Sequence, residues 1–401
     1  MLTNRQLFLQ HLAQTSSAPI MLEIVKAEGL YMYGADGKKY LDLISGVSVS
    51  NTGHCHPKVV EAVKNQVDSY MHLMVYGEII QSPQVKYAER LTGILPGELN
   101  TCYFVNSGSE AVEGALKLAK RFTRRSRIIS FKNSYHGSTH GALSIQGSEL
   151  YRNAFRPLMP DTFQVAFNDE KSLDSIDNKT ACVIIEPVQG EAGVIYPENS
   201  FLEKIRDRCN LTGALLIFDE IQTGFGRTGF MFAIDRFGVT PDILLLAKAL
   251  GGGMPLGAFL SSKEIMSSLV SNPPLGHITT FGGHPVCCAA GLASLNVIIE
   301  DKLVESCNAK SALFKNKLKH HLISEVRGEG LLLAVQLTDP VYVQFVITHA
   351  AEYGLILDYF LFCNNAFRIA PPLIISDDEI SLACRELKRL LDDAMNYAMK
   401  K

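Results

Sequence analysis

Short, wholly apolar runs alternate with longer segments of helical periodicity through the middle of this chain. The apolar runs cover residues 101–105, 181–185, 214–218 and 243–246, and the helical patterns include 109–122 and 201–210. Strands that are apolar on both faces are typical of a parallel sheet covered by helices on both sides. The pattern therefore predicts an α/β fold with a mainly parallel central sheet.

The pattern changes after about Pro285. The later segments predict a helix over 286–299, charged helices around 301–321, short strands over 330–336 and 367–369, and a final amphipathic helix from 377 onward. Such a mixture is typical of a separate α+β unit.

Near the start of the chain, short strand-like pieces surround a turn at 34–37 that contains two glycines. The pieces cover 23–26, 30–33 and 39–43, and they predict a small meander that could join the C-terminal unit. We therefore expect a large domain over 48–290 and a smaller α+β domain formed by 1–47 together with 291–401.

Composition and charge narrow the class of protein. The 401 residues are 47% hydrophobic and 20% charged, which is typical of a globular chain with a sizeable core. Lys plus Arg total 38 against 41 Asp plus Glu, and this balance argues against a dedicated nucleic-acid binder. Nine cysteines without a CxxC spacing argue against a disulfide framework or a structural zinc site. No apolar run approaches the ~20 residues of a membrane span, so we expect a soluble cytoplasmic protein.

Reactive or flexible residues follow each of the four apolar runs directly. The segments are 106–110, 186–191, 219–222, and Lys248 with the glycines 251–253. In open α/β sheets, ligands bind beyond the carboxyl ends of the strands. We therefore expect these segments to meet at one site.

Ser107, Gly108 and Ser109 stand at the start of the first predicted helix. Glycine lets the backbone approach an anion closely, and the free N–H groups and dipole of a helix start favour a phosphate. An ordinary serine N-cap would explain the same residues without any ligand. The segment by itself therefore leaves both interpretations open.

Asp219 and Lys248 lie just past the ends of two apolar runs. A carboxylate in such a place must be paired or functional, and a lysine near apolar surroundings can have its pKa lowered and attack an aldehyde. A lysine alone is more often a solvated surface charge. Together with the helix start at Ser107, however, the two residues match the three requirements of pyridoxal 5'-phosphate, at its phosphate, ring nitrogen and aldehyde.

Two other patterns indicate different chemistry. Residues 224–229 match the dinucleotide motif GxGxxG, but residues 219–223 separate them from the strand and only a short helix follows. The histidines at 54, 56, 136 and 140 suggest a metal, yet no third ligand stands at a recognisable spacing. We therefore expect no metal, while a nicotinamide-dependent oxidoreductase remains an alternative.

The chain resembles the class III (ω-amino acid) aminotransferases, pyridoxal-phosphate enzymes that include the acetylornithine, ornithine and 4-aminobutyrate aminotransferases. The matching segments, in the family's order, are GHCHP at 53–57, NSGSEA at 106–111, YHG at 135–137, EPVQGEAG at 186–193, FDEIQTGFGRTG at 218–229, AKALGGG at 247–253, TFGG at 280–283 and FRIAPP at 367–372. The resemblance implies pyridoxal-phosphate fold type I, a homodimer, and ping-pong amino transfer from an amino acid or ω-amine donor to a 2-oxo acid, with 2-oxoglutarate as the expected acceptor. An aminomutase of the glutamate-1-semialdehyde type, which shares the lysine and aspartate chemistry, is the nearest alternative.

The resemblance also implies a role for each site residue. Lys248 would bind the cofactor covalently and move a proton between substrate and cofactor, while Asp219 would pair with the pyridine nitrogen. Arg368 would bind the α-carboxylate of the substrate and would pair with Glu191 when an amine-bearing substrate occupies the site. The other cofactor contacts would come from Ser107, Gly108, Ser109, Tyr135, His136 and Gln222, and from Thr280 of a second copy of the chain.

Three positions depart from the family pattern and leave the amino donor open. Ser138 stands where the acetylornithine, ornithine and 4-aminobutyrate branches carry an arginine for a second substrate carboxylate. Val47 stands where ornithine aminotransferases carry a substrate-binding tyrosine, and His284 replaces the usual asparagine. We therefore do not expect strict specificity for ornithine or 4-aminobutyrate, and the same departures weaken the match to acetylornithine.

Overall fold

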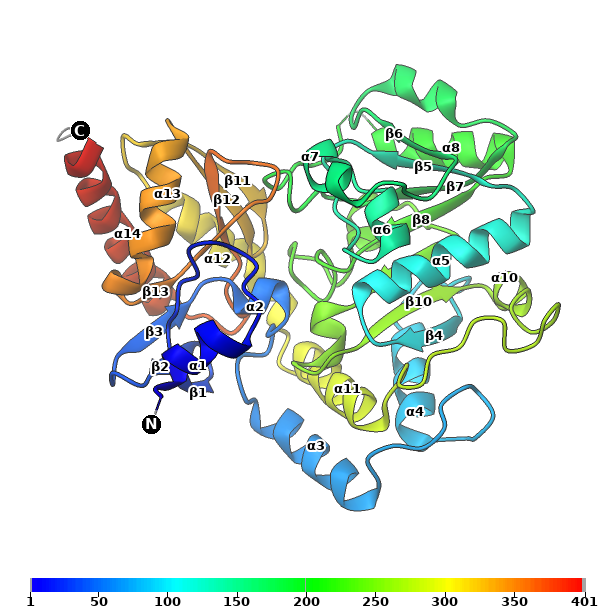
Figure 1. Cartoon of the computed structure of the whole chain (residues 1–401), viewed down its shortest axis with the longest axis horizontal. Helices are drawn as coiled ribbons and strands as arrows, with labels where there is room; N and C mark the ends of the chain where they lie inside the picture. Colours follow the sequence, from blue (N-terminus) through cyan, green and yellow to red (C-terminus); the bar gives the residue numbers. More distant parts are fainter. Residues whose placement is uncertain (1, 199, 399–401) are drawn as a thin grey trace.

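A seven-stranded sheet forms the centre of the larger lobe of the molecule (Figure 1). The computed structural model describes residues 2–198 and 200–398. The sheet has the order β4-β10-β9-β8-β7-β5-β6, and its strands are β4 (Thr101–Val105), β5 (Arg127–Phe131), β6 (Thr162–Val165), β7 (Thr180–Ile185), β8 (Leu215–Asp219), β9 (Ile243–Leu246) and β10 (Gly257–Ser261). Only β10 runs against its two neighbours, so the sheet is mainly parallel, as the apolar runs predicted.

Helices cover both faces of this sheet because successive strand residues point to opposite sides. On one face, Ile184 and Ile217 pack in a core with the helix α5 (Gly108–Thr123). On the other face, Val183 and Leu216 pack in a core with α8 (Phe201–Thr212) and α11 (Pro285–Glu300). The apolar strands β7, β8 and β9 are therefore buried on both sides.

The other helices of the larger lobe precede, connect or follow the strands of its sheet. They are α3 (Pro57–Ser69), α4 (Ser82–Thr92), α6 (His140–Ser144), α7 (Glu149–Arg152), α9 (Ala233–Phe237) and α10 (Lys263–Ser267), with the 3-10 helices η1 (Asn153–Phe155), η2 (Glu170–Ser175) and η3 (Lys248–Gly251). Both α3 and α4 pack against α11. The α9 helix ends at Gly238, whose φ of 67° suits a left-handed helix cap.

The smaller lobe contains two four-stranded sheets. One has the order β1-β2-β3-β13 and the other β11-β12-β15-β14. The strands are β1 (Ile24–Glu28), β2 (Tyr31–Gly34), β3 (Lys39–Asp42), β11 (Ile323–Glu329), β12 (Leu332–Leu337), β13 (Leu355–Ile356), β14 (Asp358–Tyr359) and β15 (Ala366–Ile369). The lobe also holds α1 (Asn4–His11), α2 (Ser45–Ser48), α12 (Leu303–Lys317), α13 (Pro340–His349), η4 (Ala350–Tyr353) and α14 (Asp377–Ala398).

Both ends of the chain contribute to this lobe, and both termini lie on its side of the molecule (Figure 1). Leu41 of β3 is the register partner of Leu355 in β13, and both share one hydrophobic core with Leu387 of α14. The domain division at residues 47/48 and 290/291 stays a prediction. Within the described residues, no helix combines the length and apolar character that crossing a membrane requires.

Candidate active site

A cavity of about 500 Å³ lies at the carboxyl ends of the parallel strands. Its walls come from the segments that follow β4, β5, β7, β8 and β9, together with Val49 and the loop before β10. The sequence-predicted residues that line it are Ser107, Gly108, Ser109, Tyr135, His136, Asp219, Gln222 and Lys248. Glu191, Arg368 and Thr280 are not among the lining residues.

Asp219 ends β8 and is only 4% exposed. His136 donates from Nδ1 to Asp219 Oδ2 over 2.7 Å, and the backbone N–H of Ile221 donates to Asp219 Oδ1 over 3.1 Å. These two bonds hold the carboxylate in one orientation at the floor of the cavity. The far ring nitrogen of His136, Nε2, is buried and has no hydrogen-bond partner in the described part of the chain.

Glu186 is a buried lining residue that the sequence did not single out as a candidate. It accepts hydrogen bonds from the backbone N–H groups of Tyr135 (2.8 Å) and Gly190 (3.0 Å). Burial raises the pKa of Glu186 to about 7; nearby His136 opposes this effect and Asp219 adds to it. Its place directly after β7, where an acidic residue must be paired or functional, was the signal that could have identified it.

Lys248 begins η3 with a φ of 50°, in the left-handed region that non-glycine residues rarely adopt. Burial lowers the pKa of its amine, because a low-dielectric environment disfavours the ammonium form. Glu191 opposes the effect and Arg368 adds to it, so both lie close enough to act on Lys248 through their charge. A lysine in this setting is more readily a neutral nucleophile than one in water.

The start of α5 faces the same cavity. Ser107 is the N-cap and its Oγ accepts from the backbone N–H of Glu110 over 3.2 Å. Ser109 Oγ accepts from the backbone N–H of Ser138 over 3.2 Å. A side chain at Gly137 would place its Cβ 2.1 Å from Ser109 Oγ, so this turn requires glycine. The free N–H groups of the helix start are therefore available to an anion.

The donor set fits pyridoxal 5'-phosphate. Gln222 Nε2 is a buried donor with no partner in the described residues. Glycine at position 190 lets Gln222 keep this orientation, because a Cβ there would lie 2.1 Å from Gln222 Oε1. An unpaired buried donor, a helix start and an amine of lowered pKa are what an anionic aldehyde with several acceptor oxygens needs.

Arg368 and Glu191 form a buried ion pair behind the cavity wall. Arg368 is 1% exposed, and its Nη2 donates to Glu191 Oε1 over 2.5 Å. The other oxygen, Glu191 Oε2, accepts from the backbone N–H of Leu361 over 3.0 Å. The two residues are 177 positions apart in the sequence, and the sequence related them only through the family resemblance.

Thr280 lies exposed in the loop before α11, away from the cavity of its own chain. Its neighbour Thr279 accepts from Asn106 Nδ2 over 2.9 Å, which ties this loop to the end of β4.

Two of the positions that depart from the family pattern are also described. Ser138 Oγ lies 3.2 Å from the Tyr135 hydroxyl, and Val47 has a φ of 63° in the α2 turn.

Residues of the two motifs that suggested a dinucleotide or a metal pair with other parts of the protein. Arg227 of the GxGxxG segment is fully buried and donates to the backbone carbonyl of Leu331 and to Ser45 Oγ. His54 Nε2 pairs with Asp42 Oδ2 over 2.8 Å, and His140 Nε2 lies 2.9 Å from the carbonyl oxygen of Pro157. These three side chains therefore connect segments that are distant in the sequence.

Comparison with known proteins decides the family. The profile of the aminotransferase class-III family matches residues 12–391. The chain belongs to the class III aminotransferases. It is 40% identical to an acetylornithine aminotransferase of Methanopyrus kandleri, over 94% of this chain and 95% of that one. It is 39% identical to one of Methanocaldococcus jannaschii, over 96% of each chain.

Solved structures of transaminases have the same fold as this class III aminotransferase. An ornithine aminotransferase from Toxoplasma gondii superposes with a TM-score of 0.90 at 30% identity and covers 97% of this chain and 93% of its own. A transaminase from the marine bacterium Virgibacillus gives 0.92 at 28% identity, covering 98% and 99%. The predicted fold type I, transaminase activity and pyridoxal-phosphate cofactor are thereby confirmed.

Proposed function

We propose that this class III aminotransferase moves an amino group from an amino acid or ω-amine donor to 2-oxoglutarate by a ping-pong mechanism. The observation that carries the proposal is the convergence of Lys248, the Asp219–His136 pair and the start of α5 on one cavity. When bound, the cofactor supplies an aldehyde that accepts the amino group and a ring that withdraws electrons from the substrate carbon.

Lys248 is the covalent attachment point and the base in this proposal. Its lowered pKa increases the fraction of neutral amine. The neutral form is required both for attack on an aldehyde and for moving a proton at the substrate carbon. Asp219 keeps the ring nitrogen protonated, because a buried carboxylate stabilises a nearby positive charge. His136 acts as a positioning residue that holds Asp219 Oδ2.

The other lining residues hold the remaining parts of the cofactor. Gln222 Nε2 would donate to its phenolic oxygen, and Tyr135 would hold its ring. The backbone and hydroxyl groups of Ser107, Gly108 and Ser109 bind its phosphate, where the dipole of the 16-residue helix α5 adds favourable charge.

Arg368 binds the α-carboxylate of glutamate or 2-oxoglutarate once Glu191 has moved aside. Arg368 is almost fully buried, and a planar guanidinium matches a carboxylate through two parallel hydrogen bonds. With an amine substrate that lacks this carboxylate, Glu191 returns to Arg368, so the same site accepts both substrates of a ping-pong cycle.

The cavity wall near Ser138 bears on the identity of the amino donor. The relatives named above are acetylornithine aminotransferases. Here Ser138 Oγ and the Tyr135 hydroxyl lie 3.2 Å apart, where an arginine would receive the donor's second carboxylate in those branches. A donor without that carboxylate, or one that binds it through another residue, fits this wall better.

The working unit in this proposal is a homodimer. Thr280 is exposed, and the neighbouring surface carries large apolar side chains, including Ile80 at 92% and Phe281 at 53% exposure. Ile80 lines a second hollow together with Thr279 and Gly282, so the two segments adjoin. An apolar surface of this kind favours a second copy of the chain, whose Thr280 would complete the phosphate site. We place the dimer in the cytoplasm, where its nine free cysteines would stay reduced.

A half-reaction screen tests the proposal. The protein is loaded with pyridoxal 5'-phosphate, and amino donors are added one at a time without an acceptor while the visible cofactor band is followed. Acetylornithine, ornithine, 4-aminobutyrate, diamines and simple amines form the panel. A true donor removes the band, and 2-oxoglutarate restores it with formation of glutamate. A rearranged product without any acceptor would instead show an aminomutase.

A further inference from the structure

Two carboxylates from different parts of the fold face the guanidinium of Arg368. Glu191, from the loop after β7, bonds Arg368 Nη2 at 2.5 Å. Asp358 Oδ2 lies 3.7 Å from Arg368 Nη1. Asp358 and Arg368 are direct register partners on the antiparallel strands β14 and β15, so their side chains lie on the same face of the sheet.

The two carboxylates bind Arg368 differently. The Glu191 contact is a hydrogen bond, whereas Asp358 is too far away for one, and its Oδ1 accepts from the backbone N–H of Tyr359 over 2.8 Å. Arg368 Nε and Nη1 are buried and have no hydrogen-bond partner within the described chain. A substrate carboxylate that takes up these donors would therefore lie next to the charge of Asp358.

Asp358 is held in place by the segment that follows it. The backbone N–H of Leu361 donates to Glu191 Oε2 over 3.0 Å, and that of Phe362 donates to the Glu191 carbonyl over 3.1 Å. The Phe362 ring packs edge-on against Tyr151, at 5.5 Å between centroids, and the Tyr151 hydroxyl donates to the Leu361 carbonyl over 3.3 Å.

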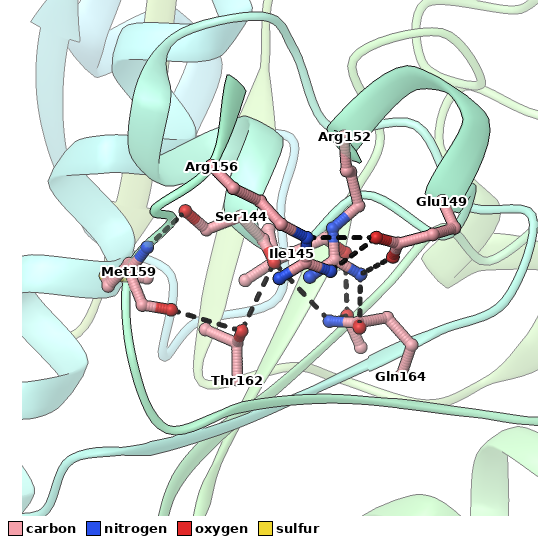
Figure 2. Close-up of polar contacts among 9 residues, drawn as sticks. Ser144, Ile145, Glu149, Arg152, Arg156, Met159, Thr162 and Gln164 are labelled. Atoms are coloured by element: carbon pink, nitrogen blue, oxygen red, sulfur yellow. Dashed lines mark hydrogen bonds and ion pairs between the residues drawn. The ribbon is translucent and has the colours of Figure 1, made fainter. Parts of the chain in front are cut away.

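Tyr151 is itself fixed, because it belongs to the anchored helix α7. Its neighbour Arg152 is buried and donates to the side-chain oxygen of Gln164 (Figure 2). Arg152 Nη1 also lies 3.8 Å from Glu149 Oε2. Ser144 Oγ accepts from the backbone N–H of Met159 over 2.8 Å and joins the same network (Figure 2). The bond from Phe362 to the Glu191 carbonyl and the contacts of Tyr151 do not involve the Glu191 side chain. We therefore expect Asp358 to stay in place when that side chain rotates away from Arg368.

We propose that Asp358 is a specificity-determining residue that weakens the binding of a substrate carboxylate at Arg368. The inference rests on the proposed role of Arg368. Once Glu191 has moved aside, Asp358 still neutralises the guanidinium, so an incoming carboxylate meets a pair of zero net charge and an anion nearby. Substrates that carry no carboxylate at this position escape the repulsion and gain relative to those that do.

The charged groups around Asp358 support this reading. Burial raises its pKa and Arg368 opposes that effect, while Glu191 and Lys248 act on it with opposite signs. The Asp358 side chain is 27% exposed, so solvent screens its charge in part. We therefore expect a moderate effect, of about tenfold, rather than the loss that follows from removing a buried salt bridge.

Two acceptors that differ by one carboxylate test the proposal. Succinic semialdehyde is 2-oxoglutarate with the carboxylate next to the carbonyl replaced by hydrogen. The ratio of kcat/KM for 2-oxoglutarate to kcat/KM for succinic semialdehyde is measured for the holoenzyme and for Asp358→Asn. We expect the ratio to rise about tenfold, with roughly 3- to 30-fold as the range, through KM for 2-oxoglutarate and with kcat changed less than about twofold.

Matched variants separate charge from folding. Asp174→Asn removes the same charge from an exposed position on η2 and should leave the ratio unchanged. Asp358→Glu keeps the charge and should also keep the wild-type ratio. If Asp358→Asn does not fold, Asp358→Ser removes the same charge and takes its place.

The outcomes are distinct. A ratio that stays within twofold of wild type, or that falls, overturns the role of Asp358 while the wild-type enzyme remains active. A change of the same size for both acceptors shows a structural effect and also overturns it. A wild-type enzyme that converts neither acceptor with any donor refutes the proposed function itself, and the role of Asp358 with it.

Discussion

His136 Nδ1 lies 2.7 Å from Asp219 Oδ2, and both side chains are buried at the floor of the cavity. The bond leaves the other carboxylate oxygen with one backbone partner, the N–H of Ile221. A carboxylate held from two sides keeps its orientation without help from a ligand. The pair therefore provides a preorganised negative charge at the end of β8, where the catalytic roles proposed above need it.

Asp219→Asn should lower kcat by roughly 10²- to 10⁴-fold, because the amide cannot keep a ring nitrogen protonated. Steady-state kinetics with saturating cofactor measure the effect, and a thermal melt checks that the fold persists. His136→Asn should lower kcat about tenfold, since it removes one hydrogen bond to the charged Asp219 carboxylate. Equal losses in the two variants would contradict the separate roles of these residues.

Lys248→Ala should abolish turnover with every donor, because it removes both the covalent attachment point and the proton-transfer group. The visible band of the bound cofactor should shift, and borohydride should no longer label the protein at this position. Lys263→Ala, at an exposed position that begins α10, is the control and should behave as wild type. Full activity in Lys248→Ala would refute the mechanism.

The strand ends of the large sheet could be predicted from the sequence because fully buried strands give unbroken apolar runs. The predicted runs at 101–105 and 243–246 coincide with β4 and β9. The residue after each run then lies at the carboxyl edge of the sheet, which is why Asp219 and Lys248 could be placed near the start of α5. The final helix likewise begins at Asp377, as predicted.

Other features depend on contacts that the pattern of one segment does not contain. The antiparallel β10 is as fully buried as its neighbour β9, so nothing in its burial marks its direction. The cross-strand contact of Asp358 with Arg368 depends on strand register, and β14 is only two residues long. The position of Thr280 relative to a cofactor depends on a second chain. Backbone strain at Val47 and Lys248 follows from tertiary packing and has no local signal.

Gly190→Ala should impair the cofactor site with little loss of stability. A Cβ at this position would lie 2.1 Å from Gln222 Oε1, the far end of a flexible side chain that can turn away. We expect a free energy of unfolding within about 1 kcal/mol of wild type, a shifted visible cofactor band, and kcat lowered roughly tenfold through the loss of one charge-assisted hydrogen bond. Gly97→Ala, where an added Cβ would meet no atom within 4 Å, is the matched control.

Glu186 should make the stability of the cofactor-free protein fall as pH rises. Burial raises its pKa to about 7 from the ordinary value of 4.5, so the folded state keeps a proton that the unfolded state has lost between these values. Since the folded state binds more protons, the free energy of unfolding decreases across this window, by about 3 kcal/mol for one group.

Glu186→Gln removes this titration. Relative to wild type, its free energy of unfolding should therefore rise between pH 4 and pH 8, whatever its offset from the lost backbone hydrogen bonds. Urea denaturation at both pH values measures the difference. Glu203→Gln, at an exposed position on α8, should show no such change. A pH-independent offset in Glu186→Gln would mean that Glu186 has an ordinary pKa.

The shared active site of the proposed dimer can be tested by mixing two defective chains. Thr280→Val should raise the cofactor dissociation constant about tenfold by removing a hydrogen bond to a phosphate, while Lys248→Ala is inactive. In a mixed dimer, the site that retains Lys248 would receive the intact Thr280 of the other chain, so co-expression should restore one wild-type site for each heterodimer. Activity at limiting cofactor then exceeds that of either variant alone. If Thr280 acted within its own chain, the mixture would show only the activity of Thr280→Val. Ile80 is 92% exposed and lines a hollow together with Thr279. If no second copy of the chain covered this surface, Ile80→Glu would leave both the oligomeric state and the activity unchanged.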